Sequence, residues 1–137
     1  MRARTGCAAI AIAAAVMATG AARAEPEAGD PVAGKDVFEQ CVKCHAVGPD
    51  AATSNAGPRL NGVVGRRSAG DKEYNYSPQF RSARLTWDVA TLSRFLKAPK
   101  STVPGTRMLF NGLASPAEIA NVIAYLAQFD EAGAVKK

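Results

Sequence analysis

The chain is poor in the residues from which most metal and redox sites are built. Among its 137 residues it has one histidine, His45, and three cysteines, Cys7, Cys41 and Cys44. A structural zinc site usually has four Cys or His ligands, and Cys7 lies in an N-terminal segment that we expect to be removed. Too few ligands therefore remain for a zinc site. A redox-active Cys-x-x-Cys pair is also disfavoured, because the βαβ pattern in which such pairs occur does not surround these cysteines.

The chain also lacks a long block of basic residues and an apolar run long enough to cross a membrane. The formal charge is +5, but three arginines lie in the N-terminal segment, and without Arg2, Arg4 and Arg23 the charge is +2. The other basic residues are dispersed, which is not the pattern of a nucleic-acid-binding surface. The apolar run at residues 7–18 is shorter than the roughly 20 residues that a membrane-spanning helix needs. We therefore expect no nucleic-acid partner and no stable insertion into a membrane.

The first 24 residues have the organisation of a secretory signal peptide. A basic start precedes the apolar run, and Ala22-Arg23-Ala24 is a cleavage site of the A-x-A type before Glu25. The sequence predicts that residues 1–24 are removed and that residues 25–137 act in the bacterial periplasm. Removing 24 of the 137 residues leaves 113, which fits one domain.

Helix signals dominate the rest of the chain. Asp30-Pro31, Ser77-Pro78 and the capping box that opens at Ser115 predict helix starts. Apolar residues then recur at helical spacing, and the alternation typical of strands is nearly absent. We predict a small all-α domain with helices from residue 31 into 41–44, from 78 to about 84, from a Thr86 cap to 97, and from 116 onward. The predicted core positions on these helices are Val37, Phe38, Leu92, Phe95, Leu96, Ile119, Val122, Ile123, Leu126 and Phe129.

The other segments are predicted to be irregular. Residues 46–76 are rich in Gly, Pro and Asn, which is typical of long loops. Loops of this length usually argue against a compact domain, unless they pack on a bound group. Residues 132–137 are predicted to be a frayed end.

The most specific motif is Cys41-Val42-Lys43-Cys44-His45. Cys-x-x-Cys-His is the attachment signature of c-type haem. Two thiols about one helical turn apart add to the two vinyl groups of haem as thioethers, and the next residue offers an imidazole to the iron. A disulfide between the cysteines is the remaining alternative, but it leaves His45 without a role. The motif therefore predicts one covalently attached haem c.

The sixth iron ligand is less well determined by the residues alone. No second histidine exists, and Met108 is the only one of three methionines outside the predicted signal peptide. A thioether opposite an imidazole is an established haem ligand pair that raises the reduction potential. A lone methionine is usually a core residue, and a lysine or an open position also remains possible at this stage.

A series of motifs in one order gives the chain a specific resemblance. From about residue 34 to 128 it resembles class I cytochrome c, of the mitochondrial and bacterial periplasmic type. The matching features are Gly34 and Phe38 before the haem motif, Gly57-Pro58-x-Leu60-x-Gly62, Gly65-Arg66 with Tyr74-Asn75-Tyr76-Ser77 and Thr86-Trp87, Pro104-Gly105-Thr106-Arg107-Met108, and Ile123-Ala124-Tyr125-Leu126.

The resemblance implies a fold and a role for each matching residue. The fold is the cytochrome c fold, in which the first and last helices cross and Gly34 meets Tyr125. The implied haem contacts are thioethers at Cys41 and Cys44 and axial ligands at His45 and Met108, with the Pro58 carbonyl accepting a hydrogen bond from His45. Around the propionates, the resemblance implies Tyr76 and Trp87 as hydrogen-bond donors and Arg66 as a counter-charge. It also implies apolar walls at Leu60 and Leu96, with Thr106 and Phe110 beside Met108. Phe95 departs from the pattern, because many relatives carry a tyrosine there.

The implied function is one-electron transfer by a monomer, not catalysis. The family takes electrons from a cytochrome bc complex and delivers them to a terminal oxidase, a reaction centre or another reductase. Two alternatives remain: a dedicated haem subunit of a periplasmic dehydrogenase, and a haem enzyme or gas sensor in which Met108 dissociates. Basic residues for docking at the haem edge are Lys43, Arg59, Lys97, Lys100 and Arg107.

Overall fold

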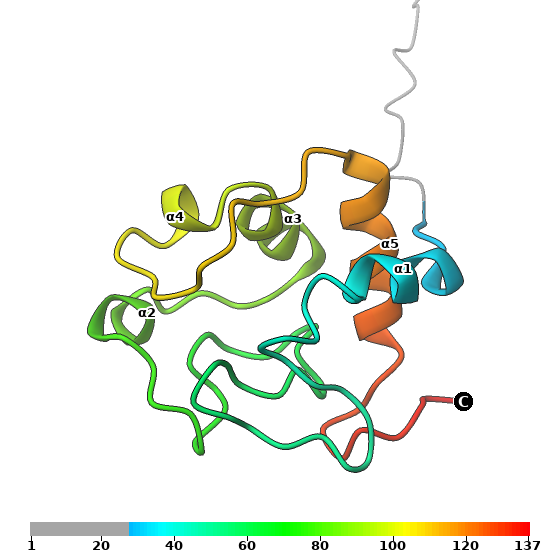
Figure 1. The fold of residues 1–137 in the computed structure, drawn as a ribbon, viewed down its shortest axis with the longest axis horizontal. Coiled ribbons are helices and arrows are strands. Elements are labelled where there is room, and N and C mark those ends of the chain that lie inside the picture. The colour runs from blue at the N-terminus through cyan, green and yellow to red at the C-terminus, as the bar shows by residue number, and fades with distance from the viewer. Residues whose placement is uncertain (1–27) are drawn as a thin grey trace, which may run out of the picture.

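The computed structural model describes residues 28–137 and shows an all-α domain, as predicted (Figure 1). The predicted signal peptide, its cleavage site and Cys7 lie outside the described residues. The helices are α1 (Pro31–Phe38), α2 (Pro78–Ser82), α3 (Val89–Lys97), α4 (Pro99–Thr102) and α5 (Pro116–Ala127). From residue 28 onward there are no strands, only two isolated β-bridges, Arg67–Thr86 and Phe129–Val135. Across this part of the chain, no helix is both long enough and apolar enough to span a bilayer.

Three helices begin where the capping signals predict. Asp30 accepts a hydrogen bond from the N–H of Val32 at 2.8 Å. Ser77 and Ser115 each accept one from the N–H three residues on, at 3.2 and 3.3 Å. In each helix proline follows the cap, so its fixed φ suits the first turn and its missing N–H leaves one donor fewer to satisfy.

The first helix is shorter than predicted. It ends at Phe38, and residues 39–44 form turns instead of continuing the helix to Cys44. The reason lies in the hydrogen bonds, because the N–H groups of residues 39, 40 and 41 bond to carbonyls three residues back, which tightens the chain. The N–H of His45 then bonds to the Cys41 carbonyl at 2.9 Å. This turn sets the positions of the two thiols and the imidazole.

The cap of α3 also differs from the prediction. Asp88, not Thr86, caps this helix, and its carboxylate accepts from the N–H of Thr91 at 2.7 Å. Thr86 instead pairs with Arg67 in a β-bridge, so its backbone is extended. The predicted apolar stripe of α3 is confirmed, and Leu92, Phe95 and Leu96 are buried.

The helix α1 crosses α5 at a point of very close approach (Figure 1). Gly34 is buried there, and a Cβ atom on it would lie 1.9 Å from the carbonyl oxygen of Asn121 and 2.9 Å from the Cβ of Tyr125. The rings of Phe38 and Tyr125 pack beside this contact with centroids 5.4 Å apart. The predicted meeting of Gly34 and Tyr125 is confirmed.

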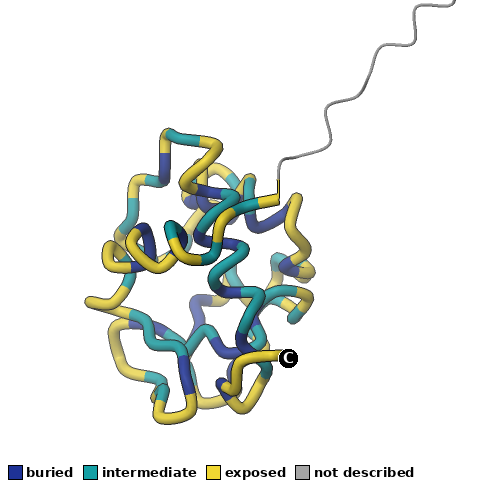
Figure 2. Tube along the Cα trace, turned by 90° about the vertical axis from the view of Figure 1, so that its right-hand side faces the viewer, coloured by how far each residue is buried: buried dark blue, intermediate teal, exposed yellow. Residues whose placement is uncertain are grey.

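The chain end is ordered, so the predicted frayed tail is wrong. The N–H of Asp130 bonds to the carbonyl of Ala134 at 2.9 Å, and the N–H of Lys136 bonds to that of Gln128 at 2.8 Å. Buried Gly133 packs against the carbonyl of Gly48 at the centre of this turn. Buried positions are found along the loops as well as the helices (Figure 2).

The helix crossing generates a stability prediction. In Gly34→Ala, the new methyl group meets the backbone of α5, which no side-chain rotation can relieve. We expect the clash to outweigh the gain of about 1 kcal/mol in helix propensity and to lower the free energy of unfolding of the haem-loaded protein by at least about 1 kcal/mol. Denaturant unfolding measures this.

The matched control is Val32→Ala on the same helix, where the side chain is 77% exposed. It should change the free energy of unfolding by less than about 0.5 kcal/mol. Equal stability of Gly34→Ala and the wild type would contradict the close crossing.

Candidate haem-binding site

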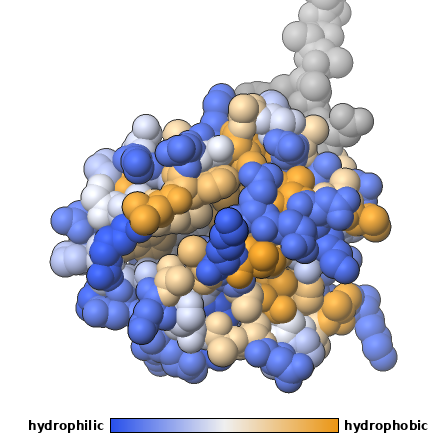
Figure 3. All heavy atoms as spheres, in the orientation of Figure 1, coloured by the Kyte–Doolittle hydropathy of each residue, from blue (hydrophilic) through white to orange (hydrophobic). Residues whose placement is uncertain are grey.

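One large cavity opens between the helices and the long loops. Its empty space is about 1200 Å³, counting the open mouth, and Figure 3 shows a hollow in this face with apolar residues along its rim. All twelve residues predicted for the site line this cavity: Cys41, Cys44, His45, Pro58, Leu60, Arg66, Tyr76, Trp87, Leu96, Thr106, Met108 and Phe110. Residues that are distant in sequence are therefore brought together around one space.

The two thiols lie at one wall of the cavity, in the turn after α1. Both are free, and Cys44 is more exposed than Cys41. Burial, helped by the neighbouring Cys44, raises the pKa of Cys41 to about 11. The Cys41 thiol is therefore uncharged at neutral pH, which suits its place against an apolar cavity.

His45 is held in one tautomer by the loop that follows it. Its Nδ1 lies 2.7 Å from the carbonyl oxygen of Pro58, so Nδ1 carries the hydrogen and donates it. Burial lowers the pKa of His45, although the bond to Pro58 acts in the opposite direction. The neutral imidazole thus keeps its Nε2 lone pair free to bind a metal ion, and metal-bound histidines typically donate their other ring N–H in this way.

Gly57 makes this approach possible. A Cβ atom at this position would lie 2.7 Å from the carbonyl oxygen of Cys44 and 2.8 Å from Cε1 of His45. Any larger residue would push the imidazole away from the Pro58 carbonyl. Position 57 therefore requires a residue without a side chain, because the Cys44 backbone and the His45 ring occupy the space where a Cβ atom would lie.

Another part of the cavity wall comes from the loop between α4 and α5. Met108 is half-buried there, and its N–H donates to the Thr106 hydroxyl at 3.3 Å. The Arg107 guanidinium ties this loop to the Asn75 carbonyl. The thioether of Met108 and the imidazole of His45 therefore border the same cavity from separate segments.

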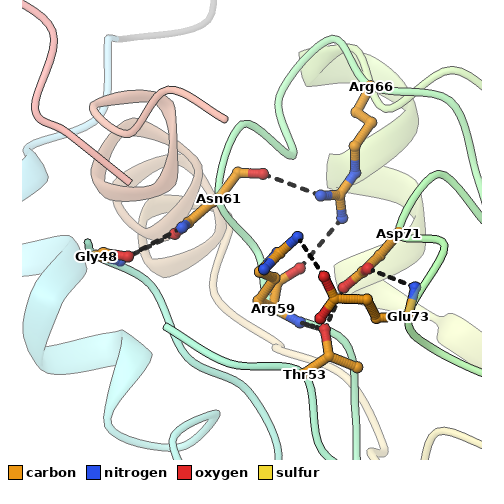
Figure 4. Close-up of polar contacts among 7 residues, drawn as sticks. All are labelled: Gly48, Thr53, Arg59, Asn61, Arg66, Asp71 and Glu73. Carbon is orange, nitrogen blue, oxygen red and sulfur yellow. Dashed lines mark hydrogen bonds and ion pairs between the residues drawn. The ribbon is translucent and has the colours of Figure 1, made fainter. Parts of the chain in front are cut away.

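A polar group at the cavity wall has an unused donor. Arg66 donates through Nη1 to the Asn61 carbonyl at 2.9 Å and through Nη2 to the Arg59 carbonyl at 3.3 Å (Figure 4). Its Nε is buried and has no hydrogen-bond partner. A buried donor without a partner is costly, so this N–H points to an anionic group that completes the site.

The donor set fits haem c. Two thiols, an imidazole and a thioether are the groups that could attach haem and bind its iron, and an unpaired guanidinium N–H suits a propionate. Between them the walls are apolar, and Trp87 and Leu96 are 5% and 8% exposed. A flat apolar macrocycle with acidic edges matches this arrangement.

The predicted site set omits several wall residues, among them Phe80 and Phe95, which form an aromatic cluster with the predicted Trp87. Phe80 of α2 packs with its ring centroid 5.8 Å from that of Trp87 and 5.9 Å from that of Phe95. Trp87 and Phe95 are 4.9 Å apart. Phe95, predicted as a core position of α3 but not as a site residue, is thus also an apolar wall residue. No spacing signal marked Phe80, because α2 is too short to show a periodic apolar face.

Comparisons with known proteins agree with the geometry. A family model described as "Cytochrome c" matches residues 31–130. Cytochrome c-554 of Methylosinus trichosporium is 50% identical over 109 residues, which are 80% of this chain and 82% of that protein. Cytochrome c2 of Rhodomicrobium vannielii is 50% identical over 100 residues, 73% of this chain and 79% of that protein. The solved structure of cytochrome cH from Methylobacterium extorquens has a TM-score of 0.67 and 39% identity, and covers 72% of this chain and 97% of its own.

The cavity generates a prediction about folding. The double variant Cys41→Ala, Cys44→Ala should be exported without covalent haem and should lose its helical circular dichroism, because the core of this small domain is then incomplete. Haem staining on a denaturing gel measures attachment. Val42→Ala, between the two cysteines and 48% exposed, is the control and should keep both haem and fold. A folded, haem-free double variant would show that haem is not structural.

Proposed function

The chain belongs to the cytochrome c family, and from that premise we propose that it is a periplasmic one-electron carrier with His45 and Met108 as axial ligands of its haem. The family carries covalently attached haem c, and the chain is an electron-transfer protein, not an enzyme. Its fold is the all-α cytochrome c fold. The observation that carries the ligand proposal is the position of His45 and Met108 on one cavity that both thiols also line.

The residues around the site have distinct tasks in this proposal. When bound, haem c supplies an iron that gains and loses one electron. His45 would bind the iron through Nε2, and its Nδ1–H bond to the Pro58 carbonyl fixes the ring and strengthens it as a donor. Met108 would supply a thioether, which favours the reduced state. With both residues holding the iron, no position would be left for a substrate.

Electrons would pass at the exposed rim of the cavity. Leu109, next to Met108, is 96% exposed and lines the cavity mouth, so it offers an apolar contact to a partner. Lys97, Lys100 and Arg107 are exposed basic residues on α3, α4 and the Met108 loop. Arg59 is a weaker docking candidate, because its guanidinium is paired with Glu73 at 3.1 Å.

The partners proposed for this surface are those of the family. We propose a cytochrome bc complex as donor and a terminal oxidase, a reaction centre or another reductase as acceptor, with the protein acting as a monomer after its signal peptide is cleaved near Ala24. An acidic docking face on the partner would complement the basic residues and raise the association rate. Charge alone steers the encounter without fixing the partner.

The ligand proposal is tested at Met108. Met108→Ala should keep the haem attached, lose the methionine-to-iron charge-transfer band and lower the reduction potential, because the thioether that favours ferrous iron is gone. Absorption spectroscopy and a redox titration measure both changes. Leu109→Ala is the neighbouring control and should keep the band. A Met108→Ala protein with an unchanged spectrum and potential would place the sixth ligand elsewhere.

The docking proposal is tested by charge reversal. Lys100→Glu should slow electron transfer to an acidic redox partner at low salt, and the difference should shrink as salt is added, because the Debye length is about 8 Å at physiological ionic strength. Stopped-flow kinetics measures the rate, and the reduction potential should change little.

The control is Lys35→Glu, which makes the same change in net charge on α1, at the other side of the domain from α4 (Figure 1). It should slow the reaction much less. Equal slowing by both variants would show that net charge, not this surface, governs docking.

A further inference from the structure

Asp71 is a buried carboxylate in a loop that the haem proposal does not use. It is 5% exposed, although the loop around it is otherwise mostly polar and open to solvent. Burying a carboxylate is costly unless it is hydrogen-bonded. The Thr53 hydroxyl donates to one of its oxygens, and the N–H of Glu73 donates to the other at 3.0 Å (Figure 4).

The structure keeps this carboxylate ionised. Burial acts to raise the pKa of Asp71, but the hydrogen bonds from Thr53 and the Glu73 N–H, together with the positive charges of Arg59 and Arg66, lower it below its usual value. Neither arginine forms an ion pair with Asp71 among the described residues, where the single ion pair joins Arg59 to Glu73. Hydrogen bonds therefore hold the Asp71 carboxylate in place, and its negative charge acts on Arg59 and Arg66 without a direct ion pair.

The charge of the Asp71 carboxylate acts on two residues of the cavity wall. Arg66 lines the cavity and attracts Asp71. Tyr76 also lines the cavity, and burial raises its pKa. The charge of Arg66 and a hydrogen bond with the Asp71 backbone act against this rise, whereas the charge of the Asp71 carboxylate adds to it. Asp71 itself does not border the cavity. The carboxylate of Asp71 is therefore separated from the cavity by lining residues, one of which is Arg66 with its unpaired Nε–H.

We propose that Asp71 is a tuning residue that lowers the reduction potential of the haem held in this cavity. The inference rests on the proposed function. In a redox titration one electron passes from dithionite to the site, whose net charge falls by one. A fixed anion nearby stabilises the more positive, oxidised state, and it also offsets the positive charge of Arg66. In a site shielded from water such a charge acts strongly.

The same loop offers a matched control. Glu73 carries the same charge two residues away, but its side chain is 62% exposed and paired with Arg59. Solvent screens such a charge. Asp71 and Glu73 therefore separate a buried charge from an exposed one within one short segment.

The experiment is a redox titration of purified, haem-loaded wild type, Asp71→Asn, Asp71→Ser and Glu73→Gln. Asp71→Asn should favour reduction at least threefold, which for a one-electron couple is a rise of about 28 mV. Asp71→Ser keeps an acceptor for the Glu73 N–H and should raise the potential in the same direction, so the test stands if the Asn variant does not fold. Glu73→Gln should shift the equilibrium less than 1.5-fold.

The sign of the shift excludes a purely structural role. A loosened loop would admit water to the haem, and greater solvent exposure favours the charged, oxidised state and lowers the potential. A rise in both neutral variants supports the proposal. An unchanged or lower potential, or an equal shift in Glu73→Gln, overturns it while leaving the haem assignment intact. Wild-type protein without covalent haem overturns the proposed function and this inference together.

Discussion

The structure depends on a core that its own side chains do not fill. Helices α1, α3 and α5 bury apolar faces, but between them and the loops remains an open cavity with largely apolar walls. A small domain buries a limited share of its surface, so a bound group would complete the core. In our proposal, attachment to Cys41 and Cys44 makes that group part of the chain, and the long loops over residues 46–76 are stabilised by packing on it.

The polar contacts around the cavity fall into two groups. One supports the residues proposed to bind the iron: the Pro58 carbonyl fixes the tautomer of His45, and the Thr106 hydroxyl supports the backbone at Met108. The other consists of the buried, unpaired N–H of Arg66 and the buried carboxylate of Asp71, whose charges attract each other. In our proposal the first group holds the iron ligands in place, and the second sets how readily the iron accepts an electron.

Much of the site was predictable because its chemistry is local in sequence. The Cys-x-x-Cys-His motif, the caps at Asp30 and Ser115, and the apolar spacing of α5 each depend on neighbouring residues. The sequence could not show that residues 39–41 tighten into turns, because that depends on how α1 meets the cavity. Nor could it show that residues 128–136 fold back by hydrogen bonds, or that Phe80 completes an aromatic wall. Asp71 escaped notice because burial of a loop carboxylate follows only from tertiary structure.

We propose that this cavity holds a covalently attached haem between His45 and Met108, and a crystal structure of the exported protein would show whether it does. We expect thioether links to Cys41 and Cys44, iron bonded to Nε2 of His45 with Nδ1 still donating to the Pro58 carbonyl, and the sulfur of Met108 as the sixth ligand. A water molecule, a lysine or an empty position opposite His45 would show that the proposed ligand pair is wrong.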